Sequence, residues 1–227
     1  MSRHTMTTAE GALVYDLEGE GPLVVLICGM GDTRAAWRHV VPARVAGGYR
    51  VAALDPRGHG ESDATFAAYT PEAVSDDVIA LVRSLDAGPA VLVGHSFAGA
   101  SVVRAAALAP ELVAGLVLVA PIVRETLGAL GGRVFRGLAK ALLQPFWGPW
   151  VWGAYYRWLF KAGAPPDHEA HVARVVALQR DPARRRAMIG VGSASKYACG
   201  ALVDRVTVPV RAVLGALDPD YDAVTEA

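Results

Sequence analysis

A serine flanked by glycines constrains this chain more than any other feature. An apolar run typical of a β-strand, residues 91–93, leads directly into Gly94-His95-Ser96-Phe97-Ala98-Gly99, and small residues with helical character follow. A serine at such a strand-to-helix turn adopts a strained backbone conformation, which requires very small neighbours. Gly94 and Gly99 meet this requirement, and Ala98 is a mild departure from the G-x-S-x-G pattern. The sequence therefore predicts a sharp bend that lifts the Ser96 hydroxyl into a position to attack.

The composition is typical of one globular domain. Of the 227 residues, 53% are hydrophobic and 19% are charged, and 22 basic residues balance 22 acidic residues. A chain of this length buries one large core without a second domain. A balanced charge gives no electrostatic basis for binding nucleic acid. We expect a small-molecule partner and no nucleic acid, and the sequence leaves the oligomeric state open.

The two cysteines and the N-terminus favour a cytoplasmic protein. Cys28 lies in an apolar run, where a free thiol packs as a small hydrophobic group, so a disulfide with Cys199 is not expected. The first eight residues lack the apolar core of a secretory signal. The longest uncharged stretch, residues 141–156, is interrupted by Pro and Gly and is shorter than the roughly 20 apolar residues that span a bilayer. We therefore expect no membrane span.

No metal or cofactor is expected. No cluster of His, Cys and carboxylate residues has the spacing of a metal site. The glycines at 29 and 31 lack the third glycine and the partner acid of a dinucleotide-binding loop.

Short apolar runs alternate with longer helix-like stretches from residue 12 onward. This pattern predicts an α/β fold, in which a mostly parallel sheet is flanked by helices. The expected strands are apolar and cover residues 12–17, 23–28, 49–54, 90–93, 115–119 and 208–214. The expected helices cover residues 33–46, 71–86 and 97–109, with several more between 123 and 203.

The regular strand pattern stops at about residue 123. We expect a core made of residues 1–122 and 204–227, interrupted by a helical cap insertion at 123–203. Four of the five tryptophans lie within twelve residues of this insertion: Trp147, Trp150, Trp152 and Trp158. Most of these side chains are expected to pack in a small core of the insertion. Some could instead line an apolar substrate pocket.

Four separated motifs resemble those of the α/β-hydrolase superfamily, in the family's order, over the chain from about Leu13 to the last residue. They are Cys28-Gly29-Met30-Gly31, which resembles the family's His-Gly-x-Gly loop with Cys in place of His; Asp55-Pro56-Arg57-Gly58-His59-Gly60-Glu61-Ser62-Asp63, which resembles D-x-R-G-x-G-x-S; Gly94-His95-Ser96; and Gly215-Ala216-Leu217-Asp218. One motif alone would be weak, but four in order are specific. The resemblance implies the α/β-hydrolase fold and a serine hydrolase.

The resemblance also implies roles for four residues. Ser96 would be the nucleophile, and Asp218 would be the acid that orients the catalytic base. The backbone N–H groups of Met30 and Phe97 would form the oxyanion hole. Because these donors belong to the backbone, Cys28 in place of His need not abolish the hole.

Asp218 has competing interpretations. The dipeptide Asp218-Pro219 is typical of an ordinary turn in any protein, and Asp220 and Asp222 lie close enough to be confused with Asp218. The order of motifs in the family favours Asp218 as the catalytic acid.

The histidine base of the family is missing. The triad order is Ser, then Asp or Glu, then His, yet none of the nine residues after Asp218 is a histidine. The six histidines have other expected places: His4 in a loose terminus, His39 in the first helix, His59 in a glycine loop with a structural hydrogen bond, His95 facing away from Ser96, and His168 and His171 in the insertion. Either the chain is a truncated hydrolase that lacks the final strand and helix, or it is a naturally short relative without ordinary turnover. Truncation is favoured, because without a base Asp218 has no role.

The sequence favours a serine hydrolase that cleaves an ester or related acyl bond of a small, largely apolar substrate through an acyl-enzyme, with impaired turnover in this chain. The alternative is a non-catalytic binding protein, which explains the absent base directly. Lyases, haloperoxidase-like enzymes and carbon–carbon bond hydrolases reuse the same serine turn, and fold resemblance cannot separate them. Dehalogenase chemistry is disfavoured, because those relatives place Asp where Ser96 stands.

Overall fold

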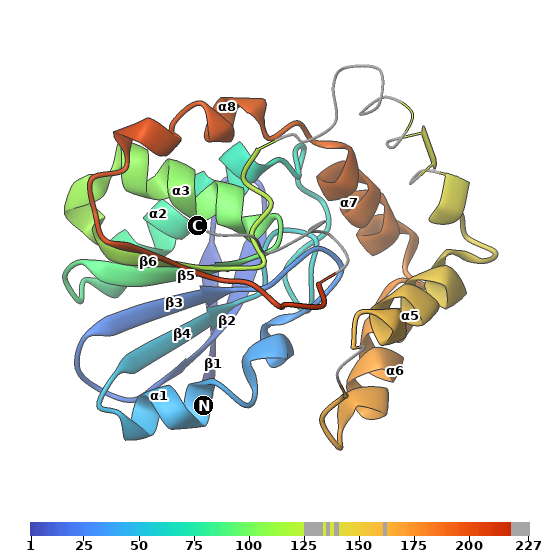
Figure 1. The fold of residues 1–227 in the computed structure, drawn as a ribbon, viewed down its shortest axis with the longest axis horizontal. Coiled ribbons are helices and arrows are strands. Elements are labelled where there is room, and N and C mark those ends of the chain that lie inside the picture. Colours follow the sequence, from blue (N-terminus) through green and yellow to red (C-terminus); the bar gives the residue numbers. More distant parts are fainter. Residues whose placement is uncertain (125–133, 135–136, 139–140, 161–162, 219–227) are drawn as a thin grey trace.

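A seven-stranded sheet forms the centre of the protein (Figure 1). The computed structural model describes residues 1–124, 134, 137–138, 141–160 and 163–218. The strands follow the order β1-β2-β4-β3-β5-β6-β7. Their bounds are β1 Ser2–Thr7, β2 Ala12–Glu18, β3 Leu23–Ile27, β4 Arg50–Leu54, β5 Ala90–His95, β6 Val113–Val119 and β7 Val210–Val213. Only the β1–β2 and β2–β4 pairs are antiparallel, so the expected mostly parallel sheet is confirmed.

Helices cover both faces of the sheet. Helices α2 (Pro71–Leu85) and α3 (Ala98–Leu108) lie on one face, and the short 3-10 helix η1 (Arg34–Trp37) and α1 (Val41–Ala46) lie on the other (Figure 1). Each face therefore has its own buried apolar cluster, as the near-continuous apolar strands require.

The remaining described helices lie between β6 and β7, apart from the 3-10 turn η2 (Pro110–Leu112). They are α5 (Gly148–Trp158), α6 (His168–Leu178), α7 (Pro182–Ser193), α8 (Tyr197–Gly200) and the 3-10 turn η3 (Val203–Arg205). Figure 1 shows α5, α6 and α7, here called the inserted helices, beyond one end of the sheet. They share a small core of Leu143, Trp152, Val175 and Met188. The boundaries of the insertion at 123 and 203 stay a prediction.

Three of the four clustered tryptophans are not packed as expected. Trp147, Trp150 and Trp158 are 49%, 74% and 50% exposed, and only Trp152 is buried. The expectation that most of them fill a core was wrong, because Trp152 is the one tryptophan of this cluster that packs with Leu143, Val175 and Met188.

Strand β1 was not expected, and His4 lies in it rather than in a loose terminus. The strand is an exposed edge that pairs antiparallel with β2, and the His4 ring stacks on Tyr15 at 5.3 Å between ring centroids. Exposure alternates along β1, but one of its two half-buried positions is the polar His4, and only Met6 packs against the main core. Its sequence therefore carries little pattern.

The first expected helix, residues 33–46, is interrupted. Its N-terminal part is the 3-10 helix η1, and α1 begins only at Val41. Pro42 lacks a backbone N–H and cannot continue the hydrogen-bond ladder of the preceding turn. His39 consequently lies in the turn between the two helices, where its Nε2 is 3.1 Å from Asp167 Oδ1.

Both cysteines are buried free thiols, as expected for Cys28. Within the described ranges, no helix combines the length and the apolar character needed to cross a bilayer. The same part of the chain contains no group of three His, Cys, Asp or Glu side chains that could hold a metal ion.

Candidate active site

The bend at Ser96 has the geometry that its glycine neighbours predict. Ser96 has a backbone φ of +54°, in the left-handed region that non-glycine residues rarely adopt. A Cβ added to Gly94 would lie 2.7 Å from the Ala98 carbonyl oxygen, and one added to Gly99 would lie 2.8 Å from Cβ of Pro121. Side chains at either glycine would therefore collide with the structure that supports the bend.

Backbone hydrogen bonds fix this bend between β5 and α3. The Ser96 N–H donates to the Val119 carbonyl at 3.0 Å, and the Ser96 carbonyl accepts from the N–H groups of Gly99 and Ile122 at 2.9 and 3.0 Å. Ser96 remains half-buried rather than covered. The strained residue is thus held by its neighbours while its side chain stays accessible.

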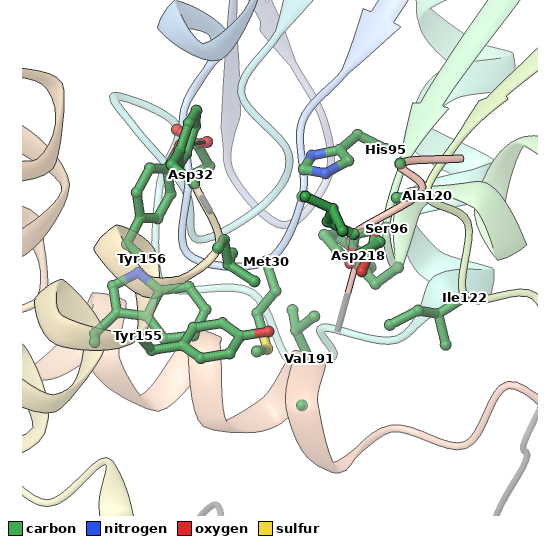
Figure 2. Close-up of a pocket in the computed structure, with 18 of the residues that line it drawn as sticks. Met30, Asp32, His95, Ser96, Ala120, Ile122, Tyr155, Tyr156, Val191 and Asp218 are labelled. Atoms are coloured by element: carbon green, nitrogen blue, oxygen red, sulfur yellow. Dashed lines mark hydrogen bonds between the residues drawn. The ribbon is translucent and has the colours of Figure 1, made fainter. Parts of the chain in front are cut away.

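Ser96 opens into a cavity of about 660 Å³ at the carboxyl ends of the parallel strands (Figure 2). Strands β3 and β5 are adjacent and parallel, yet β4 lies on the other side of β3. Ligands of open α/β sheets bind at such a point, where successive connections run to opposite sides. The wall contains all four residues that the sequence assigns to catalysis: Met30, Ser96, Phe97 and Asp218.

An oxyanion hole needs backbone N–H groups that are not already engaged in hydrogen bonds, and Met30 and Phe97 meet this requirement. Within the described part of the chain, neither backbone N–H donates a hydrogen bond. The loop that carries Met30 lies against the bend, because a Cβ added to Gly29 would be 3.3 Å from Cβ of Ser96. Phe97 is the N-cap of α3, so the positive end of the helix dipole lies at the same place.

Asp218 lines the cavity from the segment that follows β7, the edge strand next to β6. Its backbone N–H donates to the Gly215 carbonyl at 3.0 Å to close a turn. Asp218 lines the same cavity as Ser96, and both are labelled in Figure 2. The two competing acids, Asp220 and Asp222, lie outside the described residues.

Four histidines have hydrogen-bond partners other than Ser96: His4 bonds to Ser2, His39 to Asp167, His59 to the Arg57 carbonyl and His171 to Asp32. His59 is buried with Nδ1 3.0 Å from the Arg57 carbonyl, as expected for a structural residue, and burial lowers its pKa below the ordinary value. His95 lines the same cavity as Ser96, and the expectation that its side chain points away from Ser96 stays a prediction.

The D-x-R-G-x-G-x-S motif builds the scaffold rather than the cavity wall. Asp55 is buried, and its Oδ1 accepts from the Arg34 backbone N–H at 2.6 Å while its Oδ2 accepts from the Glu61 N–H at 2.9 Å. A Cβ on Gly60, which has a φ of +49°, would fall 2.0 Å from Asp55 Oδ2. This loop therefore needs glycine where the carboxylate passes.

Sequence reasoning missed two polar residues beside the site, Asp32 and Tyr156, and gave His171 only a slight chance of reaching it from the insertion. Asp32 and Tyr156 line the cavity, and His171 bonds to Asp32 from behind. Asp32 directly follows the glycine loop, which is the one sequence signal that could have indicated it.

Comparison with known proteins decides the family. The model of the alpha/beta hydrolase fold family matches residues 22–183. The chain belongs to this family. The α/β-hydrolase fold expected from the four motifs is therefore confirmed.

The α/β-hydrolase relatives with curated names are enzymes. The chain is 36% identical over 123 residues to 2-(acetamidomethylene)succinate hydrolase of Mesorhizobium japonicum. The aligned region is 53% of this chain and 44% of that enzyme. The chain is also 38% identical over 109 residues to the putative non-heme bromoperoxidase BpoC of Mycobacterium tuberculosis. This aligned region is 48% of the chain and 41% of that relative. The matches thus span less than half the length of these relatives.

Solved structures of α/β hydrolases extend the likeness of fold over almost the whole chain. An esterase from Thermogutta terrifontis superposes with a TM-score of 0.79 at 23% identity and covers 96% of this chain and 81% of its own. A bromoperoxidase from Bacillus anthracis superposes with a TM-score of 0.76 at 21% identity, covering 94% and 81%. At these identities, the superpositions establish the fold alone.

Proposed function

We propose that this α/β hydrolase is a serine hydrolase that cleaves an ester or related acyl bond of a small, largely apolar compound, with Ser96 as the nucleophile. One observation carries the proposal. The strained, accessible Ser96 shares a cavity with the two backbone N–H groups of Met30 and Phe97, which make no other hydrogen bond among the described residues.

The chemistry follows from this arrangement. Ser96 Oγ attacks the substrate carbonyl carbon, its proton passes to a base, and the carbonyl oxygen becomes an oxyanion that accepts hydrogen bonds from Met30 and Phe97. Collapse of this intermediate expels the protonated leaving group and leaves an acyl group on Ser96. Water then attacks the acyl carbon and releases the acid. Asp218 is proposed to orient the base.

The proposal assigns no histidine of this chain as the base, and we therefore expect slow turnover. Without the base, the hole and the binding site still supply about a 10³-fold acceleration in serine hydrolases of known mechanism. Reaction at Ser96 remains measurable with an activated reagent.

The cavity wall supports an apolar substrate. Its lining is rich in aliphatic and aromatic side chains: Met30, Phe97, Ile122, Trp152, Tyr155, Leu159, Phe160 and Val191. A cavity of about 660 Å³ accommodates a small molecule.

Labelling with an alkyl fluorophosphonate tests the proposal. We expect one adduct per chain in intact mass spectra, located at Ser96 by peptide mapping and absent from Ser96→Ala. Ser101→Ala, which removes a buried hydroxyl from α3, the helix that follows Ser96, is the matched control and should still be labelled. If the folded protein forms no adduct, or if the adduct is on a residue other than Ser96, the proposal is overturned.

A second candidate function is non-catalytic binding of an apolar ligand. It is favoured by the partners of His59 and His171, which bond to the Arg57 carbonyl and to Asp32 rather than to Ser96. Saturable binding of a fatty alcohol that Ser96→Ala leaves unaltered, together with no phosphonate adduct, would support it. Labelling of Ser96 would exclude it.

A further inference from the structure

We propose that Asp32 is a positioning residue, which ties the loop of residues 29–32 to the inserted helices and so fixes the direction of the Met30 N–H. The inference rests on the proposed function, because that function assigns Met30 to the oxyanion hole.

Asp32 connects three separate parts of the chain. It is 3% exposed, and its Oδ2 accepts a hydrogen bond from the Tyr156 hydroxyl of α5 at 2.5 Å. Its Oδ1 accepts from His171 Nε2 of α6 at 2.8 Å and from the Thr33 backbone N–H at 2.7 Å. Two inserted helices are thus bonded to one carboxylate, which lies two residues after Met30.

The bonded carboxylate is charged. Burial opposes its ionisation, but the hydrogen bonds from His171 and Tyr156 outweigh this effect, so the pKa of Asp32 lies below the ordinary value. Burial and the neighbouring Asp32 raise the pKa of Tyr156, which keeps its hydroxyl proton for this bond. Hydrogen bonds to a charged group are roughly twice as strong as those between neutral groups.

The inserted helices also contact the two residues that precede Asp32. Gly31 has a φ of +70°, and a Cβ there would lie 2.7 Å from the indole ring of Trp152 in α5. The Met30 sulfur would lie 3.2 Å from a Cβ on Gly192 in α7. All three inserted helices therefore contact this loop, and Asp32 accepts hydrogen bonds from two of them, α5 and α6.

This arrangement couples the cavity wall to the oxyanion hole. Met30, Asp32 and Tyr156 all line the cavity, and Figure 2 shows Tyr156 directly beside Asp32. A movement of α5 or α6 pulls on Asp32 and, through two peptide units, reorients the Met30 N–H. The stability of the oxyanion therefore depends on hydrogen bonds of Asp32 in which Ser96 takes no part.

The Tyr156→Phe variant tests the coupling, with Tyr197→Phe as the matched control. Tyr197 is 77% exposed on α8, so its variant also loses one phenol hydroxyl but none that bonds Asp32. We expect Tyr156→Phe to lower the saturating first-order rate of phosphonate labelling about ten-fold, since misplacing a catalytic group by about 1 Å costs up to about 100-fold. The half-saturating concentration should change less than about two-fold. Amide exchange of residues 29–33 should become faster.

Variants of His171 provide a second test, which can still be carried out if Tyr156→Phe fails to fold. His171→Gln keeps a donor near the Asp32 carboxylate and should label within about two-fold of the parent rate, whereas His171→Leu removes the donor and should resemble Tyr156→Phe. Equal labelling rates and equal amide exchange for His171→Leu and the Tyr197→Phe control overturn the positioning role.

The two proposals fail in different ways. A parent protein that is never labelled overturns the serine hydrolase. Amide exchange of residues 29–33 then decides the role of Asp32 alone: faster exchange in His171→Leu supports it, and unchanged exchange overturns it.

Discussion

Replacement of Gly94 by alanine probes how tightly the bend at Ser96 is packed. The added Cβ would lie 2.7 Å from the Ala98 carbonyl oxygen, 2.8 Å from Val102 Cγ2 and 2.9 Å from the Ala98 carbonyl carbon. Two of these atoms belong to the backbone of α3, so relief requires α3 to shift against β5. Overpacking of this kind costs up to about 3 kcal/mol. Reduced freedom of the unfolded chain returns about 0.4–1 kcal/mol.

The net expectation for Gly94→Ala is a loss of about 2 kcal/mol in the free energy of unfolding. Gly115→Ala, in the neighbouring strand β6, is the matched control, because its Cβ would meet only the Pro209 carbonyl oxygen, at 3.2 Å. There the small contact cost and the gain from the unfolded state cancel, and we expect a change near zero.

Urea denaturation followed by circular dichroism measures both changes. A difference of about 2 kcal/mol corresponds to about 4–8 °C in Tm for a chain of this size. The labelling rate of Ser96 should also fall in Gly94→Ala, since the bend moves with α3. If the two alanine variants lose the same free energy within about 0.5 kcal/mol, the contacts around Gly94 do not constrain the bend and the reasoning is wrong.

Two further predictions concern buried charges. Arg57→Met should cost about 3–5 kcal/mol by urea denaturation, because it leaves Asp77 buried without the guanidinium whose Nε lies 2.7 Å away, and adding Asp77→Leu should recover most of the loss. Asp32 has a pKa below the ordinary 3.8, so its hydrogen bonds stabilise the fold fully above about pH 4 and lose their effect as the pH falls further. The difference in unfolding free energy between the parent and Asp32→Asn should therefore be constant from about pH 7 to 5 and shrink below about pH 4, and a difference that grows on acidification would contradict this assignment.

The sequence was sufficient for the bend and for the central strands. Gly94 and Gly99 lie within three residues of Ser96, so their crowding is a local property. Strands β3 to β6 have apolar runs because both of their faces are covered. The order of the four motifs indicated which strand ends meet at the cavity.

The inserted helices show where sequence reasoning stopped. The tryptophan cluster predicted an apolar core, but only Trp152 is buried there. Aromatic residues carry no local signal for burial or exposure, because the neighbours that cover them come from other segments of the chain.

The amino-acid sequence alone therefore indicated that Ser96 lies at the sharp bend and that the chain belongs to the α/β-hydrolase family. Tertiary structure alone brought Tyr156 and His171 to Asp32, across 124 and 139 residues of sequence. The physical reason is range: backbone strain and apolar periodicity act over a few residues, whereas the partners of a buried carboxylate are selected by how whole helices pack.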